Sequence, residues 1–223
     1  MFRKWLAIFK KDTLMDKAYQ RSFEMLEITR EMFCEAKDSL RQREDSEIDL
    51  EVKNKDKEVN SYEREVRRMV FNHLAVRGTT DLPSGLALVS IIIDIERLGD
   101  YAKNMVELAM DHPGKLEGGS FEDVITRIED AVGDSFVKTR KCFMEGNEAL
   151  ALKLLDKYAW VNDSCDDTAI AIVREKDKNI RAGDAAALAL YVRWLKRINS
   201  HLRNITTSVV NPFDRIGFQP KKK

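Results

Sequence analysis

Apolar residues recur every three or four positions along almost the whole chain, which is the spacing of one face of an α-helix. In the first such stretch, the apolar stripe passes through Ala18, Met25, Ile28, Met32 and Ala36. Longer intervals of this pattern are separated by short segments rich in Gly, Pro or Asn. The pattern predicts an all-α protein whose helices cover residues 12–40, 46–76, 83–110, 120–145, 148–181 and 185–210.

The interruptions of the pattern carry residues that end or begin helices. Gly78 suits the C-terminal cap of the second helix, and Pro83 suits the first turn of the third. The clearest boundary is the Gly-rich segment 112–120, after which Ser120 is the expected N-cap of the fourth helix. Asp184 is the expected N-cap of the last helix. The order is therefore three helices, a linker and three more helices.

An internal repeat supports a division into two halves. Residues 95–105 and 195–205 align without gaps at an offset of 100 residues, with Arg, Leu or Ile, and Asn at matching places. Short connections make successive helices antiparallel, so the simplest packing is two tandem three-helix bundles side by side. The predicted organisation is an N-terminal basic and apolar segment, a first repeat, a second repeat and a tail, over residues 1–12, 13–112, 120–211 and 212–223.

The composition agrees with long helices and excludes some classes of function. Charged residues make up 34% of the chain, with only 10 Gly and 4 Pro. The 38 basic residues balance the 38 acidic ones, so no overall positive field favours nucleic acid. The cysteines, Cys34, Cys142 and Cys165, form no CxxC pattern and are expected to be free thiols in a reducing compartment.

No apolar run approaches the ~20 residues that a membrane-spanning helix needs. Residues 1–12 combine apolar and basic side chains, but their apolar stretch is too short for a secretory signal. We therefore expect a cytoplasmic protein. The same segment could form a short helix on a membrane surface, or it could pack on the bundle or on a partner.

The candidate binding residues lie on one face of the third predicted helix. Glu96, Asp100 and Asn104 follow one another at intervals of four residues, on the stripe that also includes Leu88 and Ile92. Carboxylates on a core-facing stripe are partly desolvated, and two of them one turn apart repel each other. A bound metal ion would relieve both penalties, because oxygen donors one turn apart can share a cation.

The spacing also allows a simpler interpretation. Glu96 and Asp100 could pair with Arg97, with Lys103 or with a neighbouring helix on a solvated face. The histidines have no ligand spacing, and the chain contains no Gly-rich phosphate loop, GxSxG or HExxH motif.

A family resemblance bears on this choice. Residues 94–104, Asp-Ile-Glu-Arg-Leu-Gly-Asp-Tyr-Ala-Lys-Asn, resemble the signature of the PhoU family, Leu/Ile-Glu-Arg-Ile-Gly-Asp-x-Ala-x-Asn-Ile. Residues 56–63, Asp-Lys-Glu-Val-Asn-Ser-Tyr-Glu, resemble a second run of the family, Asp-x-x-Val-Asn/Asp-x-x-Glu. The resemblance spans about residues 13–211, but it is strong only in the first repeat.

The resemblance implies a metal site. In the family, each three-helix repeat can bind a transition metal, often iron, between carboxylates of its second and third helices. Transferred by position, the implied ligands here are Asp56, Asn60, Glu96 and Asp100, with Asn104 next along the stripe. One site is expected, in the first repeat.

The second repeat departs from this pattern. Lys196, Ser200 and Tyr158 stand where the first repeat has Glu96, Asp100 and Asp56. We therefore expect no metal in the second repeat. As a hypothesis, the Lys196 ammonium takes the place of the cation and pairs with an acid such as Asp163 or Asp166.

The resemblance also implies a function. PhoU proteins regulate phosphate uptake and its signalling through contact with the ATPase subunit of a phosphate transporter and with a sensor histidine kinase, and many form dimers. A regulatory protein that is no enzyme, and that meets a membrane only peripherally, is therefore expected. Two alternatives stay open: a carboxylate-bridged metal enzyme, although the chain has no Glu-x-x-His pair, and a metal-free helical adaptor.

Overall fold

The computed structural model of the protein describes residues 13–42 and 50–220, and within these ranges the chain forms helices and turns without any strand. The helices before the linker are α1 Leu14–Arg41, α2 Leu50–Arg77 and α3 Leu82–Asp111. The helices after it are α4 Glu122–Glu145, α5 Glu148–Lys157, α6 Ala159–Val173 and α7 Ala182–Val210. Short 3-10 segments are η3 Gly78–Asp81, η4 Gly119–Phe121 and η5 Phe213–Arg215.

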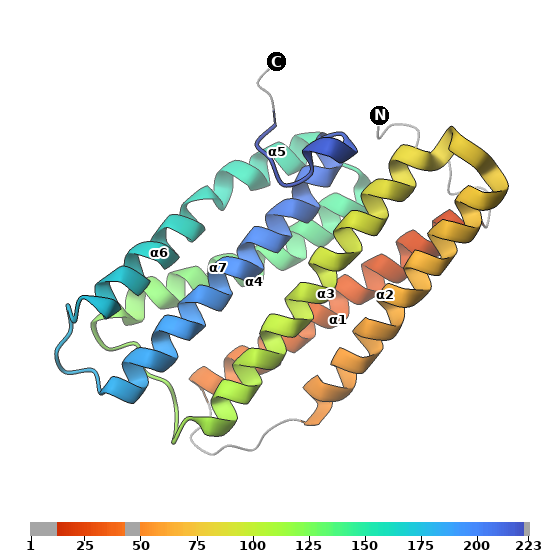
Figure 1. Cartoon of the computed structure of the whole chain (residues 1–223). Helices are drawn as coiled ribbons and strands as arrows, with labels where there is room; N and C mark the ends of the chain where they lie inside the picture. Colours follow the sequence, from red (N-terminus) through yellow and green to blue (C-terminus); the bar gives the residue numbers. More distant parts are fainter. Residues whose placement is uncertain (1–12, 43–49, 221–223) are drawn as a thin grey trace.

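The helices form two bundles that lie side by side (Figure 1). In the first repeat, α1, α2 and α3 pack against one another, and in the second repeat, α4, α5, α6 and α7 do so. The repeats meet where α3 packs against α7 and α1 against α4. The predicted all-α architecture of two adjacent bundles is confirmed.

Local signals place the helix ends of the first repeat. The Thr13 hydroxyl accepts a hydrogen bond from the Asp16 backbone N–H at 3.2 Å, and the Asp16 carboxylate accepts one from the Thr13 N–H at 3.1 Å. This reciprocal capping box begins α1. Gly78 directly follows α2 and has φ of 68°, a left-handed conformation that glycine adopts at little cost.

The second repeat differs from the prediction in its middle helix. The helix predicted over residues 148–181 is divided at Tyr158, where φ is −105° and ψ is 14°, and its second part ends at Val173. The Tyr158 side chain is buried, and its hydroxyl donates a hydrogen bond to Asp134 Oδ2 on α4 at 2.5 Å. The helix stops early because residues 174–181 are mostly charged and polar and have no apolar face to bury.

Two predicted N-caps are wrong. α4 begins at Glu122 without a side-chain cap, and the Ser120 backbone N–H instead donates to Asp177 Oδ2 at 2.9 Å. α7 begins at Ala182, so Asp184 lies in its first turn. The Asp184 carboxylate accepts hydrogen bonds from Arg181 at 2.7 and 2.9 Å, which explains why it does not cap the helix.

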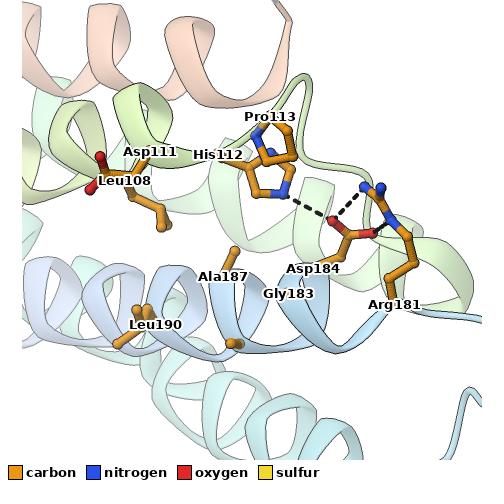
Figure 2. A pocket seen from close by; sticks show the side chains of 10 residues that line it. Leu108, Asp111, His112, Pro113, Arg181, Gly183, Asp184, Ala187 and Leu190 are labelled. Carbon is orange, nitrogen blue, oxygen red and sulfur yellow. Dashed lines mark hydrogen bonds and ion pairs between the residues drawn. The ribbon is translucent and has the colours of Figure 1, made fainter.

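Polar contacts join the end of the first repeat to the second. His112 follows α3, and its Nδ1 lies 2.5 Å from the Gly114 carbonyl oxygen. Its Nε2 lies 3.0 Å from Asp184 Oδ1 (Figure 2). His112 and Asp184 border a pocket of about 350 Å³ between the end of α3 and the start of α7. Deeper in the molecule, the buried guanidinium of Arg41 on α1 lies 2.8 Å from Glu129 Oε1 on α4.

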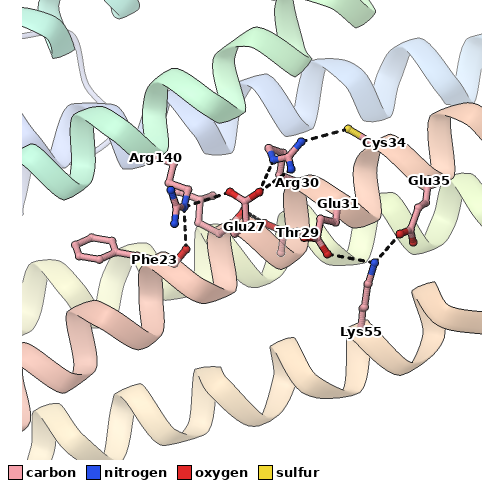
Figure 3. Close-up of polar contacts among 10 residues, drawn as sticks. Phe23, Glu27, Thr29, Arg30, Glu31, Cys34, Glu35, Lys55 and Arg140 are labelled. Atoms are coloured by element: carbon pink, nitrogen blue, oxygen red, sulfur yellow. Dashed lines mark hydrogen bonds and ion pairs between the residues drawn. The ribbon is translucent and has the colours of Figure 1, made fainter.

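Ion pairs also line the sides of α1 (Figure 3). Lys55 of α2 reaches Glu31 at 3.3 Å and Glu35 at 2.5 Å. On the side that faces α4, Arg140 lies 3.3 Å from Glu27 and donates to the Phe23 carbonyl at 3.3 Å. α1 is thereby tied both to α2 and to the second repeat.

A shared apolar core supports this arrangement. Phe33 of α1 stacks on Phe136 of α4 with ring centroids 5.3 Å apart, and both side chains are fully buried. The cysteines are free, and Cys142 and Cys165 are buried. Within the described ranges, no helix has the length and apolarity to cross a membrane. The predicted N-terminal segment 1–12 lies outside the described residues.

Candidate metal centre

The predicted ligands come from two adjacent helices of the first repeat. Asp56 and Asn60 lie one turn apart on α2, and the Asn60 amide donates to Asp56 Oδ2 at 3.4 Å. Glu96 and Asp100 lie one turn apart on α3. The side chains of Asp56 and Glu96 are only 14% and 16% exposed, so both carboxylates are substantially withdrawn from water.

Basic side chains already neutralise part of this charge. Lys103 Nζ lies 3.2 Å from Asp56 Oδ2 and 3.7 Å from Asp100 Oδ1, so one ammonium bridges α2 and α3. Arg97 Nη1 donates to Asp100 Oδ2 at 2.8 Å, and Arg97 Nε lies 3.6 Å from Glu96 Oε2. The ion pairs that the sequence offered as the simpler interpretation are therefore present.

Negative charge nevertheless exceeds what these pairs balance around Glu96. Burial raises the pKa of Glu96, and the nearby charges of Asp100, Glu63 and Asp56 raise it further, while Arg97 opposes them. A raised carboxyl pKa means that the ionised form is disfavoured at this position. An added cation would therefore be stabilised here.

Sequence reasoning missed Glu63 as a member of this group. Glu63 lies on α2, its side chain is 15% exposed, and it pairs with Arg67 at 2.8 Å. Its position was visible in the sequence, because it ends the run of residues 56–63 that resembles the family, about two helical turns after Asp56. Asn104 extends the stripe by one turn, and no hydrogen bond within the described residues joins it to the other predicted ligands.

The oxygen atoms of these side chains are suitable metal ligands, but the Lys103 ammonium already lies between Asp56 and Asp100. Carboxylate and amide oxygens are suitable ligands for divalent cations. Within residues 13–42 and 50–220, however, no three Asp, Glu, His or Cys side chains are grouped so as to hold a metal ion as they stand. A metal would have to displace the Lys103 ammonium from between Asp56 and Asp100.

The equivalent place in the second repeat is a neutral hydrogen-bond network. The Asn162 amide donates to Ser200 Oγ at 3.1 Å, and the Asn199 amide donates to Asn162 Oδ1 at 2.9 Å. Lys196 pairs with Asp166 on α6, which confirms the predicted pairing with one of its two candidate acids. A site of carboxylates in one repeat thus corresponds to amides, a hydroxyl and a lysine in the other.

Comparison with known proteins assigns the first repeat. Residues 23–109 match the family model described as the PhoU domain, and this range contains all five predicted ligands. The first repeat is therefore similar in sequence to a PhoU domain. No curated protein matches this chain significantly in sequence.

The PhoU fold extends over both repeats. PhoU from Pseudomonas aeruginosa shares the fold with a TM-score of 0.77 and 20% identity, over 88% of this chain and 95% of that one. The phosphate transport system regulatory protein PhoU from Streptococcus pneumoniae also gives a TM-score of 0.77, with 16% identity, over 88% and 93% of the two chains. The second repeat therefore keeps the architecture of a PhoU domain although its acidic positions have been replaced.

Proposed function

We propose that this protein is a PhoU-like regulator of phosphate uptake or phosphate signalling that acts by binding a partner and not by catalysis. The PhoU domain of residues 23–109 supports the proposal, as does the fold shared with a phosphate transport system regulatory protein. The expected partner is the ATPase subunit of a phosphate transporter or a sensor histidine kinase, met in the cytoplasm. A homodimer is a further part of the proposal.

The proposal includes one transition-metal site in the first repeat, with iron the first candidate. Asp56, Glu96 and Asp100 would supply the carboxylates and Asn60 an amide oxygen, with Asn104 next to them. The metal would supply positive charge that neutralises these side chains and links α2 to α3. The observation that carries this part is the arrangement of the carboxylates: Asp56 and Glu96 are only 14% and 16% exposed, and Asp100 lies one turn from Glu96. Burial, and then the nearby carboxylates, raise the pKa of Glu96, which agrees with this arrangement.

The Lys103 bridge favours a second candidate, a metal-free helical adaptor. Its ammonium already lies between Asp56 and Asp100 and ties α2 to α3 without a metal. Both candidates give the same fold and the same class of partner. They differ only in which cation, a metal ion or the Lys103 ammonium, links the carboxylates of α2 to those of α3.

The metal content of purified protein tests the proposal. We compare the wild type with Glu96→Ala/Asp100→Ala and with a matched control on the same helix, Glu107→Ala/Asp111→Ala, whose side chains are exposed. Elemental analysis should find metal in the wild type and the control, and little in the Glu96/Asp100 variant. Metal that is unaffected by that variant would rule out the site, and a metal-free wild type would favour the adaptor.

The partner is tested in the same set of proteins. Each variant is used as bait in extracts of the native host, and the captured proteins are identified by mass spectrometry. A transporter ATPase or a sensor kinase captured by the wild type and the control supports the regulatory function. Failure to capture either would contradict it, whatever the metal content.

A further inference from the structure

His112 links the end of the first repeat to the start of the second. It directly follows α3, and its side chain is only 5% exposed. Its Nδ1 lies 2.5 Å from the Gly114 carbonyl oxygen in the linker. Its Nε2 lies 3.0 Å from Asp184 Oδ1 in the first turn of α7 (Figure 2). Both nitrogens of a buried imidazole therefore face oxygen atoms that accept hydrogen bonds but cannot donate them.

This geometry determines how many protons the ring must carry. A neutral imidazole has one N–H group and one bare lone pair, so it can donate to only one of the two oxygens. The lone pair then faces the other oxygen at hydrogen-bonding distance, which is repulsive. The imidazolium has a proton on each nitrogen and can donate to Gly114 and Asp184 at once. The two contacts are therefore complete only when His112 is charged.

The charged groups around the ring are mainly acidic. Hydrogen bonds from Arg181 lower the pKa of Asp184, burial opposes them, and the hydrogen bond from His112 lowers it further. The Asp184 carboxylate therefore stays ionised over the pH range in which histidines titrate. Further charged groups of the described residues at this junction are Asp111, Lys115, Glu117, Arg41, Glu122 and Asp177. Arg41 pairs with Glu122, and the other four are three acids and one lysine, so positive charge does not accumulate beside His112.

The linker has a second point of attachment beyond the ring. The Leu116 backbone N–H donates to the Leu40 carbonyl of α1 at 2.9 Å, and the Leu116 side chain is fully buried. His112 thus attaches the start of the linker to the second repeat. The pocket of about 350 Å³ lies beside the ring, with leucines of α3 and α7 in its walls (Figure 2). Because of this space, the ring can leave Asp184 and water can enter without a change in the core.

We propose that His112, Gly114 and Asp184 form a pH-sensitive latch between the two repeats. At low pH the imidazolium donates to both oxygens, and the end of α3 is held against the start of α7. When the ring loses one proton, a lone pair faces an oxygen, and one of the two contacts opens. The closed latch needs one proton more than the open one, so it is favoured at low pH and is lost as the pH rises through the range in which histidines titrate. The latch goes beyond the proposed function and does not depend on the metal.

Nuclear magnetic resonance of the histidine rings counts the protons directly. The full chain is labelled with ¹⁵N histidine, and the ring signals are assigned with the variants His73→Gln, His112→Gln and His201→Gln. At about pH 5 His112 should show two protonated ring nitrogens, and at about pH 8 it should show one. A folded protein whose His112 carries a single proton at both pH values would overturn the proposal.

Hydrogen exchange of two backbone amides reports whether the latch is closed. The N–H groups of His112 and Leu116 donate to the Leu108 and Leu40 carbonyls, each at 2.9 Å, so both exchange only when the junction opens. Protection is corrected for the faster intrinsic exchange at higher pH. In the wild type it should fall roughly 10-fold between about pH 5 and about pH 8, because a hydrogen bond between charged groups is lost.

Two variants should remove this pH dependence for different reasons. His112→Gln keeps a side-chain amide that can donate to Asp184 but does not titrate. Asp184→Asn offers an amide that accepts from a protonated ring nitrogen or donates to a bare one, so either form of His112 is satisfied. In both variants, protection of the Leu116 amide should be the same at the two pH values.

His73→Gln is the matched control. His73 is also a buried histidine that pairs with an aspartate, Asp81 at 2.8 Å, but it lies within the first repeat, between α2 and η3. This variant should keep the pH dependence of the wild type at Leu116. Thermal unfolding at both pH values checks that each variant is folded. The proposal is overturned if wild-type protection does not change with pH, if His112→Gln and Asp184→Asn keep the wild-type change, or if His73→Gln abolishes it.

Discussion

Replacing Arg41 with Met tests how the two repeats are held together. The guanidinium is 3% exposed and contacts three groups of the second half of the molecule: Glu129 at 2.8 Å, the Glu122 carboxylate, and the Leu116 carbonyl in the linker. The Tyr191 hydroxyl on α7 donates to the same Glu129 oxygen at 2.7 Å. Arg41 therefore links α1 to α4, to the linker and, through Glu129, to α7.

The magnitude follows from the charge that is left behind. Glu129 is 7% exposed, so Arg41→Met leaves its carboxylate buried with only a tyrosine hydroxyl as partner. Removing one partner of a buried pair costs about 3–5 kcal/mol. For a chain of this size, 1 kcal/mol lowers Tm by about 2–4 °C, so the expected loss is roughly 6–20 °C.

The assay is thermal unfolding followed by circular dichroism, with urea unfolding as a second measure. Arg41→Met/Glu129→Gln is the matched variant, because Gln carries no charge and can still accept the Tyr191 hydrogen bond. The double variant should recover most of the lost stability. A single variant within about 1 kcal/mol of the wild type, or a double variant no more stable than the single one, would refute the argument.

Three further substitutions probe the paired sites. Lys103→Met should lower the stability of the metal-free protein by about 0.5–1 kcal/mol and raise its affinity for added metal, because the bridging cation is gone. Lys196→Glu removes the pair with Asp166 and puts two acids together, so it should destabilise the metal-free protein by about 1 kcal/mol. Burial raises the pKa of Asp134, but hydrogen bonds from two lysines and a tyrosine lower it well below 3.8. Asp134→Asn should therefore destabilise at neutral pH; the difference should begin to shrink as the pH falls below 3.8 and should vanish only when the pH is below the lowered pKa of Asp134.

Each of these substitutions has a result that would contradict its prediction, and Lys103→Met also has a control. Lys57→Met, at an exposed position of α2, should leave stability and metal affinity unchanged. If Lys103→Met also left both unchanged, the Lys103 ammonium would not link α2 to α3. Unchanged or raised thermal stability of Lys196→Glu without added metal would show that the lysine does not replace a cation. For Asp134→Asn, a stability difference that does not shrink as the pH falls below 3.8 would mean that packing, and not charge, is lost.

The helical pattern predicted most of the fold because its signals are local. The period of apolar residues located the helices, and Gly78 and Gly146, both left-handed, mark turns that the sequence showed. The division at Tyr158 was not visible in the sequence; the contact that accompanies it is a hydrogen bond to Asp134, a residue 24 positions earlier on another helix. Local spacing contains no information about such a partner.

The candidate site was predicted as a set of residues but not as an arrangement. The spacing on α3 and the family resemblance predicted that Glu96, Asp100 and Asp56 belong to one site. In the structure, the Lys103 ammonium pairs with both Asp56 and Asp100. Which cation holds the carboxylates could not be read from spacing, because a lysine and a metal satisfy the same acidic side chains. Glu63 ends the run of residues 56–63 that resembles the family, but it was not named as a ligand; its charge acts on Glu96 across the contact between α2 and α3.

The most direct test of the central claim is a crystal structure of protein purified with its native metal, with anomalous diffraction measured at the iron edge. The account predicts an anomalous peak between α2 and α3 beside Glu96, Asp100 and Asp56, with the Lys103 ammonium moved away from it. It predicts no peak beside Lys196 in the second repeat. A structure without a peak at the acidic face, in which Lys103 still bridges Asp56 and Asp100, would contradict the claim that these carboxylates bind a metal.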